Sequence, residues 1–133
     1  IYIQDFSCGG NHLGMLIKNT NKLCMIGENT DYQCGTKSGY SLPVCTENIL
    51  NIDSNKIIKV KCGGRHTIIE CENTIYYAFG NNNNRTCLIE GFGWFSKPTL
   101  ISNAYVKEFM NIKTKILEYI PANDTTYILT SKF

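Results

Sequence analysis

The chain has 133 residues, of which 43% are hydrophobic and 18% are charged, and its formal net charge is +2, which suits one domain with a modest core. A chain that binds a nucleic-acid backbone carries a clustered excess of Lys and Arg, because each neutralised phosphate needs a cation, so direct nucleic-acid binding is not expected. No run approaches the roughly 18 apolar residues of a membrane helix, and the start lacks the basic and apolar regions of a signal peptide, so we expect neither.

The first predicted strands follow a glycine turn. The segment "CGGNH" at residues 8–12 precedes an apolar run from Leu13 to Lys18, and a polar turn at residues 19–21 separates that run from a second one, Lys22 to Ile26, which ends at Gly27. Glycine permits a positive φ and a close approach of two backbones. The pattern predicts short antiparallel strands joined by tight turns.

The next predicted strands repeat this order. The apolar residues Ile57, Ile58 and Val60 lead into "CGGRH" at residues 62–66, and the run Thr67 to Ile69 follows. A tight turn at residues 72–73 precedes a third strand at residues 74–79, which is rich in β-branched and aromatic side chains and ends at Gly80-Asn81. No segment shows a helical periodicity of comparable strength.

A fixed offset relates the two copies. Their Cys-Gly-Gly turns begin at Cys8 and Cys62, 54 positions apart, and their closing glycines, Gly27 and Gly80, are 53 positions apart. Such a period indicates a repeat architecture, in which each unit packs on its neighbours. We divide the chain into units at residues 1–56 and 57–115 and a degraded third unit at residues 116–133.

The third unit is identified from one short segment that can be aligned with the second unit. In "EYIPANDTTYILT", residues 118–130, Thr125 and Thr126 can be placed where His66 and Thr67 stand in the second unit. This segment lacks both the Cys-Gly-Gly turn and the His, as an atypical terminal repeat can. The alternative is that one generic pair of strands has been aligned on another.

These spaced residues resemble the repeat of the regulator of chromosome condensation family. The resemblance implies an all-β fold, an incomplete β-propeller of two to three four-stranded antiparallel blades, because family members close a ring of seven blades and this chain holds about two and a half units. The second unit departs from the family after Asn82, since it has no Gln and only a displaced Gly91. The residues that carry the resemblance are Cys8, Gly9, Gly10, His12, Gly27, Asn29, Gln33, Gly35, Cys62, Gly63, Gly64, His66, Gly80 and Asn82.

The motif residues are predicted to be structural rather than catalytic. His12 and His66 recur at one position of the repeat with no carboxylate at a matching offset, which favours packing and turn bonding. "GGNHLG" lacks the second glycine of a dinucleotide loop, and no Cys-x-x-Cys spacing is present. We therefore expect no catalytic residue, metal or cofactor, and we interpret the seven cysteines as small buried side chains in a reducing compartment, cytoplasm or nucleus, rather than a disulfide framework.

The candidate partner-binding residues are Phe92, Trp94 and Phe95, in "EGFGWFSKP" at residues 90–98. The first unit has the polar "TKSGYSLP" there, with Tyr40 as its one aromatic residue. Large aromatic side chains in a loop are enriched at protein interfaces, but Trp94 could equally pack beneath its own blade. The stretch Lys107 to Lys115 is expected to be a short helix or a surface insertion with a solvated face.

An array of two and a half units leaves blade faces and strand edges uncovered. The chain is thus either a fragment of a longer propeller or a reduced one that another protein, or another copy of itself, completes. We favour a non-catalytic interaction or structural module that docks on a larger assembly, and RNA contact is expected only through a ribonucleoprotein assembly. The alternative, which the family resemblance implies, is a guanine-nucleotide exchange factor, or a fragment of one, for a Ran-like small GTPase.

Overall fold

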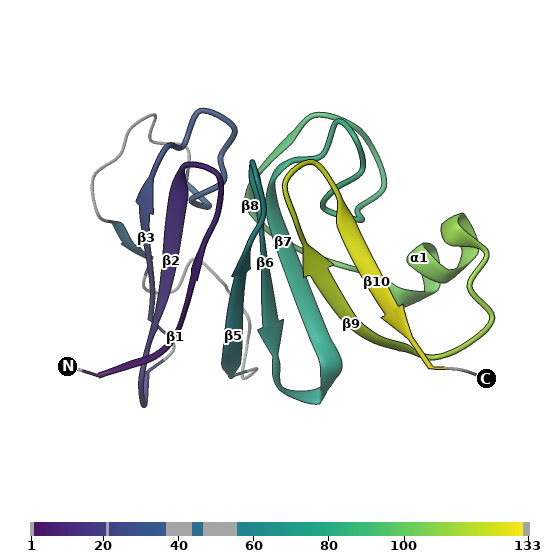
Figure 1. The fold of residues 1–133 in the computed structure, drawn as a ribbon, viewed down its shortest axis with the longest axis horizontal. Coiled ribbons are helices and arrows are strands. Elements are labelled where there is room, and N and C mark those ends of the chain that lie inside the picture. The colour runs from purple at the N-terminus through teal and green to yellow at the C-terminus, as the bar shows by residue number, and fades with distance from the viewer. Residues whose placement is uncertain (1, 21, 37–43, 47–55, 132–133) are drawn as a thin grey trace.

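Three antiparallel sheets lie side by side along the longest axis of the molecule (Figure 1). The computed structural model describes residues 2–20, 22–36 and 56–131, and the backbone of residues 44–46. The first two sheets have four strands each, and the third has two in this part of the chain. The predicted all-β fold of partial propeller blades is confirmed.

Each sheet takes its strands in chain order, from one consecutive stretch of sequence. The first contains β1 (Ile3–Cys8), β2 (His12–Ile17), β3 (Leu23–Gly27) and β4 (Val44–Thr46). The second contains β5 (Ile57–Cys62), β6 (His66–Cys71), β7 (Ile75–Asn81) and β8 (Trp94–Leu100), with a short 3₁₀ turn, η1 (Glu72–Thr74), between β6 and β7. The third contains β9 (Ile116–Pro121) and β10 (Thr126–Thr130). The division into units 1–56, 57–115 and 116–133 stays a prediction.

The strand registers repeat with the sequence. Cys8 lies opposite Leu13 in the first sheet, and Cys62 lies opposite Thr67 in the second, 54 positions later. An irregularity interrupts β1 between Ile3 and Asp5, and another interrupts β5 at the same place. Equal sequence spacing therefore produces equal backbone geometry in the two sheets.

Two apolar cores separate the three sheets. The first core lies between the first two sheets and includes Leu16, Met25 and Ile69, all fully buried. The second lies between the second and third sheets, where Tyr76 and Tyr119 meet edge to face with ring centroids 4.9 Å apart. Because each sheet is apolar on the face that meets its neighbour, the units stack face to face, as propeller blades do.

A helix, α1 (Asn103–Met110), covers the end of the second core. Ser102 caps its start, because the Ser102 hydroxyl accepts a hydrogen bond from the N–H of Tyr105, and Asn111 ends it in the left-handed conformation. The helix therefore begins four residues before the predicted stretch Lys107 to Lys115 and ends within it, at Met110. No helix in the part of the chain that the structure describes has the length and apolar character needed to cross a membrane.

The cysteines are in different states. Cys34, Cys62, Cys71 and Cys87 are buried free thiols, as expected, and Cys8 is a free thiol at the surface. Burial raises the pKa of the Cys87 thiol to about 12, so it stays protonated. Cys24 departs from the expectation, because it is disulfide-bonded.

Candidate functional site

Each Cys-Gly-Gly turn lies against the corresponding turn of the next unit. The N–H of Gly10 donates to the carbonyl oxygen of Gly63 at 3.1 Å, and the N–H of Gly64 donates to the carbonyl oxygen of Ala122 at 2.9 Å. A Cβ atom on Gly9 would lie only 2.3 Å from the Gly63 oxygen. Glycine is therefore required here by the close approach of the next unit rather than by a positive φ, which the glycines of these turns do not adopt.

Each histidine of the repeat lies against the first glycine of its own turn. A Cβ atom on Gly9 would lie 2.5 Å from Cε1 of His12, and one on Gly63 would lie 2.2 Å from Cε1 of His66. The glycine leaves the space that the imidazole ring fills, so "Cys-Gly-Gly-x-His" is one packed unit. This geometry explains why the glycine and the histidine occur together in both copies.

The first histidine reaches across to the second unit. Nε2 of His12 lies 2.9 Å from Oγ1 of Thr67, and that hydroxyl donates to the carbonyl oxygen of Gln33 at 2.7 Å. The threonine has one hydroxyl proton and gives it to Gln33, so His12 must donate from Nε2–H. The result is a buried histidine–threonine–carbonyl relay between the first two units.

The same relay joins the second and third units. Nε2 of His66 lies 2.9 Å from Oγ1 of Thr126, which donates to the carbonyl oxygen of Thr86 at 2.5 Å. Thr126 thus takes the place of Thr67, although its surroundings are less buried. The relay recurs even though the third unit has no Cys-Gly-Gly turn and no histidine of its own.

Both imidazoles are neutral at physiological pH. Burial lowers the pKa of His12 and of His66 from 6.5 to about 4, because it penalises the charged ring. A neutral ring supplies the Nε2–H that the relay needs. The arrangement supports a role in joining units rather than in transferring protons.

The loop after the third strand of each unit closes in the same way. Asn29 accepts a hydrogen bond from the N–H of Cys34 at 2.9 Å, and Asn82 accepts one from the N–H of Cys87 at 3.0 Å. The amide nitrogen of Asn82 also donates to the carbonyl oxygens of Ile89 and Gly91. These asparagines hold the loops whose carbonyl oxygens receive the relays.

Gln33 and Gly35 have counterparts in the second unit that the sequence did not indicate. Gln33 is fully buried, and Thr86 supplies the equivalent carbonyl oxygen 53 positions later. Gly35 has a φ of 77°, and Leu88, at the matching position, has a φ of 55° despite its side chain. The departure from the family pattern therefore changes side chains but keeps the backbone, and Gly91 is not the replacement for Gly35.

The three aromatic candidates of the second unit have different surroundings. Nε1 of Trp94 donates to Oδ1 of Asp31 at 2.8 Å, so this half-exposed ring reaches the first unit instead of packing beneath its own blade. Phe95 packs against the second core. Phe92 is exposed beside Arg85, whose guanidinium carbon lies 4.8 Å from the ring centroid. Of the three, Phe92 is the most open to a partner.

Comparisons with known proteins agree with this geometry. The family model of the regulator of chromosome condensation (RCC1) repeat matches residues 21–69. The X-linked retinitis pigmentosa GTPase regulator of Homo sapiens is 37% identical over 126 residues, and that of Canis lupus familiaris is 30% identical over 126 residues. These alignments cover 93% of this chain but only 11% and 12% of the two relatives, so the chain spans about a tenth of their length.

Solved structures show the same fold. Human WBSCR16 superposes with a TM-score of 0.74 at 16% identity, over 97% of this chain and 31% of that protein. Prp20p from Saccharomyces cerevisiae superposes with a TM-score of 0.71 at 17% identity, over 98% of this chain and 31% of that protein. Residues 21–69 therefore carry the regulator of chromosome condensation (RCC1) repeat, and the described chain folds as neighbouring blades of a β-propeller.

Proposed function

We propose that the chain is a non-catalytic interaction or structural module that docks on a larger assembly through its uncovered blade faces. One observation carries this proposal: residues at equivalent positions are buried between units and exposed at the ends of the array. Phe6 on β1 is 66% exposed, whereas Val60, its counterpart on β5, is 2% exposed beneath the first sheet. The outer face of the first sheet thus has the apolar character of a face that is normally covered.

The opposite end of the array has a similar face. Tyr127 on β10 is 62% exposed, whereas Ile68, at the equivalent position on β6, is fully buried beneath the third sheet. Leu129 is also exposed on the same strand. Exposed apolar side chains that recur at both ends are typical of surfaces that another protein covers.

The solved neighbours support protein partners. Yeast RCC1 (Prp20) has been solved bound to Kap60, and the structure of Prp20p was solved together with its binding properties to Gsp1p and histones. For this chain we propose a protein partner, or a second copy of itself, in the cytoplasm or nucleus. The buried free thiols support a reducing compartment, and the disulfide of Cys24 is the observation that opposes it.

Nucleotide exchange on a Ran-like small GTPase is the second candidate function. The observation that favours it is that the curated relatives are described as GTPase regulators. A nucleotide-release assay with a Ran-like GTPase loaded with a fluorescent guanine nucleotide separates the two candidates. Release that is catalysed by this chain would support exchange and overturn the non-catalytic proposal.

The docking proposal is tested by measuring mass. We expect the chain to associate or to scatter heterogeneously in size exclusion with light scattering, because both end faces are apolar. Phe6→Ser and Tyr127→Ser should each reduce that association, whereas Lys97→Ser, on the exposed side of β8, should not. A folded, monodisperse monomer that these substitutions leave unchanged would show that the faces need no cover, and would refute the proposal.

A further inference from the structure

Arg85 is held between aromatic rings on the surface beside α1. Its guanidinium carbon lies 4.8 Å from the ring centroid of Phe92 and 4.6 Å from that of Phe109. Its Nη1 donates to the hydroxyl of Tyr105 at 2.5 Å, and the Tyr105 ring stacks on Phe109 with centroids 5.9 Å apart. We call these four residues, which come from the loop after β7 and from α1, the Arg85 clamp.

The clamp fixes a cation without neutralising it. The ion pairs among the described residues join Lys61 to Glu118 and Arg65 to Asp31, and no described carboxylate pairs with Arg85. A guanidinium has five N–H donors in a planar fork, and the hydrogen bond to Tyr105 uses one of them. Because the rings already restrict this side chain, binding an anion costs less conformational entropy than it would for a free surface arginine.

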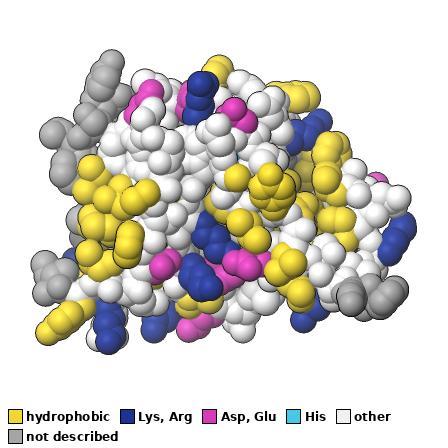
Figure 2. Space-filling model, in the orientation of Figure 1, with side chains coloured by type: hydrophobic (Ala, Val, Ile, Leu, Met, Phe, Trp, Pro, Cys, Tyr) yellow, Lys and Arg dark blue, Asp and Glu magenta, His cyan; other side chains and the backbone are white. Residues whose placement is uncertain are grey.

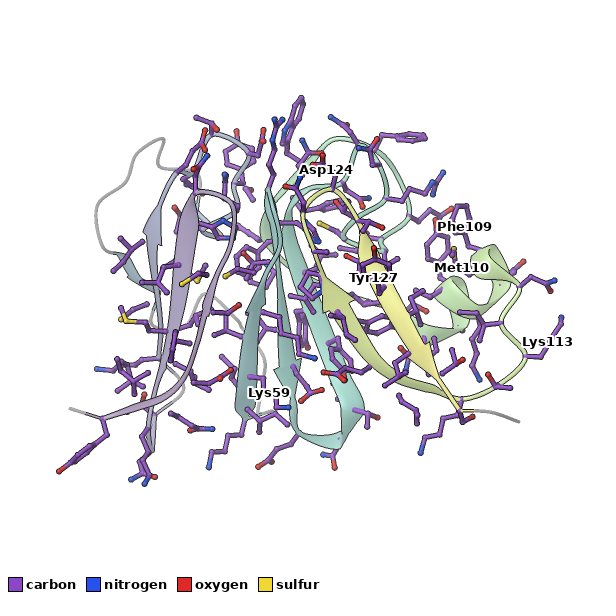
Figure 3. The ribbon with its side chains drawn as sticks, viewed as in Figure 1. Lys59, Phe109, Met110, Lys113, Asp124 and Tyr127 are labelled. Carbon is purple, nitrogen blue, oxygen red and sulfur yellow. The ribbon has the colours of Figure 1, made fainter. Side chains whose placement is uncertain are left out.

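An apolar surface flanks the clamp. Phe92 is 71% exposed, Phe109 is 51% exposed and Met110 is 49% exposed. Figure 3 shows Phe109 and Met110 together at the end of α1, with Lys113 on the segment that follows. Aromatic residues, Met and Arg are the types enriched at protein interfaces, and a flexible Met can adapt to an incoming side chain.

The sequence range that contains the four clamp residues carries excess positive charge, which favours an acidic partner. Residues 85–115 contain five cationic and two acidic side chains, a local net charge of +3 that exceeds the +2 of the whole chain. Hydrophobic side chains gather on the side of the molecule that carries α1, with basic side chains at their margin (Figure 2). The charged residues in this range are Arg85, Glu90, Lys97, Lys107, Glu108, Lys113 and Lys115.

We propose that the Arg85 clamp docks an acidic peptide segment that carries an apolar side chain. A carboxylate of the peptide accepts two N–H bonds from the open edge of the Arg85 guanidinium, the bidentate geometry that arginine favours. The neighbouring apolar side chain packs on Phe92, Phe109 and Met110. The residues of this surface differ from those of the two end faces, so it stands or fails separately from the docking proposed above.

The binding test uses a short synthetic peptide of glutamate and leucine with blocked ends and a fluorescent label. Fluorescence anisotropy at physiological ionic strength should show saturable binding to the chain. Replacing every Glu by Gln, or every Leu by Ser, should weaken binding at least about tenfold, because each change removes one of the two required contacts. Equal binding of the Gln peptide, or no saturation below about 1 mM, would overturn the proposal.

Three substitutions locate the binding on the chain. Arg85→Lys keeps the charge but loses the planar fork and should weaken peptide binding about tenfold, as should Phe92→Ser, which removes an exposed ring without touching a core. Phe6→Ser is the matched control, because it removes an equally exposed phenylalanine from the far end of the array, and it should leave peptide binding unchanged. Far-ultraviolet circular dichroism checks that each variant folds.

Two outcomes would refute the assignment to the clamp. If Phe6→Ser weakens peptide binding as much as Phe92→Ser does, the peptide binds at the end faces or without specificity. Tighter binding of a single-stranded oligonucleotide of equal charge would make the surface a nucleic-acid site. Failure of the docking proposed above is distinguishable, because it is measured as self-association, which Phe92→Ser should leave intact.

Discussion

The relay hydroxyl of Thr67 offers a direct test of what joins the first two units. Replacing Thr67 by Val keeps the shape of the side chain but removes the hydroxyl that links His12 to Gln33. Thr67 is fully buried, so water cannot easily replace the two lost hydrogen bonds. The substitution leaves a buried imidazole N–H and a buried carbonyl oxygen without a partner.

The expected loss follows from these two groups. Leaving one buried polar group unsatisfied costs roughly 1–3 kcal/mol, and the extra methyl group of Val regains up to about 1 kcal/mol. Thr67→Val should therefore lower the free energy of unfolding by about 3 kcal/mol. Thr126→Val breaks the equivalent relay at a half-buried position, so its effect should have the same sign but be smaller.

Urea denaturation measures the change. Far-ultraviolet circular dichroism follows the sheets, and the fluorescence of Trp94, the one tryptophan in the chain, follows the contact with Asp31 of the first unit. Thr99→Val is the matched control, because the Thr99 hydroxyl donates to Lys97 at an exposed site. A Thr67→Val variant within about 0.5 kcal/mol of this control would refute the relay as a stabilising junction.

Three further predictions follow from the same junctions. The free energy of unfolding should fall as the pH drops from about 6.5 to about 4, because the pKa values of His12 and His66 lie near 4 in the folded chain and the unfolded chain takes up protons first. A difference of about 2.5 pKa units corresponds to roughly 3 kcal/mol for each histidine. Urea titrations at several pH values measure this loss of stability. Gly63→Ala should abolish soluble folding, whereas Gly91→Ala, with nothing within 4 Å of the added methyl group, should cost only about 1 kcal/mol of backbone strain, as thermal unfolding will show. Iodoacetamide should modify Cys8 before the four buried free thiols, because burial holds their pKa values high, and peptide mass mapping will identify the labelled residue.

The strands could be predicted closely from the sequence. The apolar runs and glycine turns placed β2 at His12–Ile17 and β6 at His66–Cys71 to within one or two residues. Two aligned copies constrain each other, because a strand that is ambiguous in one copy has a counterpart in the other. The repeat also indicated the stacking of units, since neither copy can bury both of its faces alone.

The contacts between units could not be predicted in the same way. The bond between His12 and Thr67 spans 55 positions, and the sequence marks the histidine but not its partner, because threonine is common in any strand. Leu88 gives no sign of its left-handed backbone, which its loop imposes. Arg85 and Phe109 lie in different elements that follow no repeat, so only the folded chain shows that they meet.

The contacts that join neighbouring units also limit how a partner could bind at the two ends of the array. Each junction needs a Gly-Gly turn and histidine from one unit and a threonine hydroxyl from the next. The first unit has Leu13 where the second has Thr67, so its outer face cannot receive a relay. The third unit has Ala122 and Thr125 in place of the glycine and histidine, so its outer face cannot offer one. A partner that covers these faces, as we propose, should therefore bind mainly through apolar contact rather than through the hydrogen bonds that join one unit to the next.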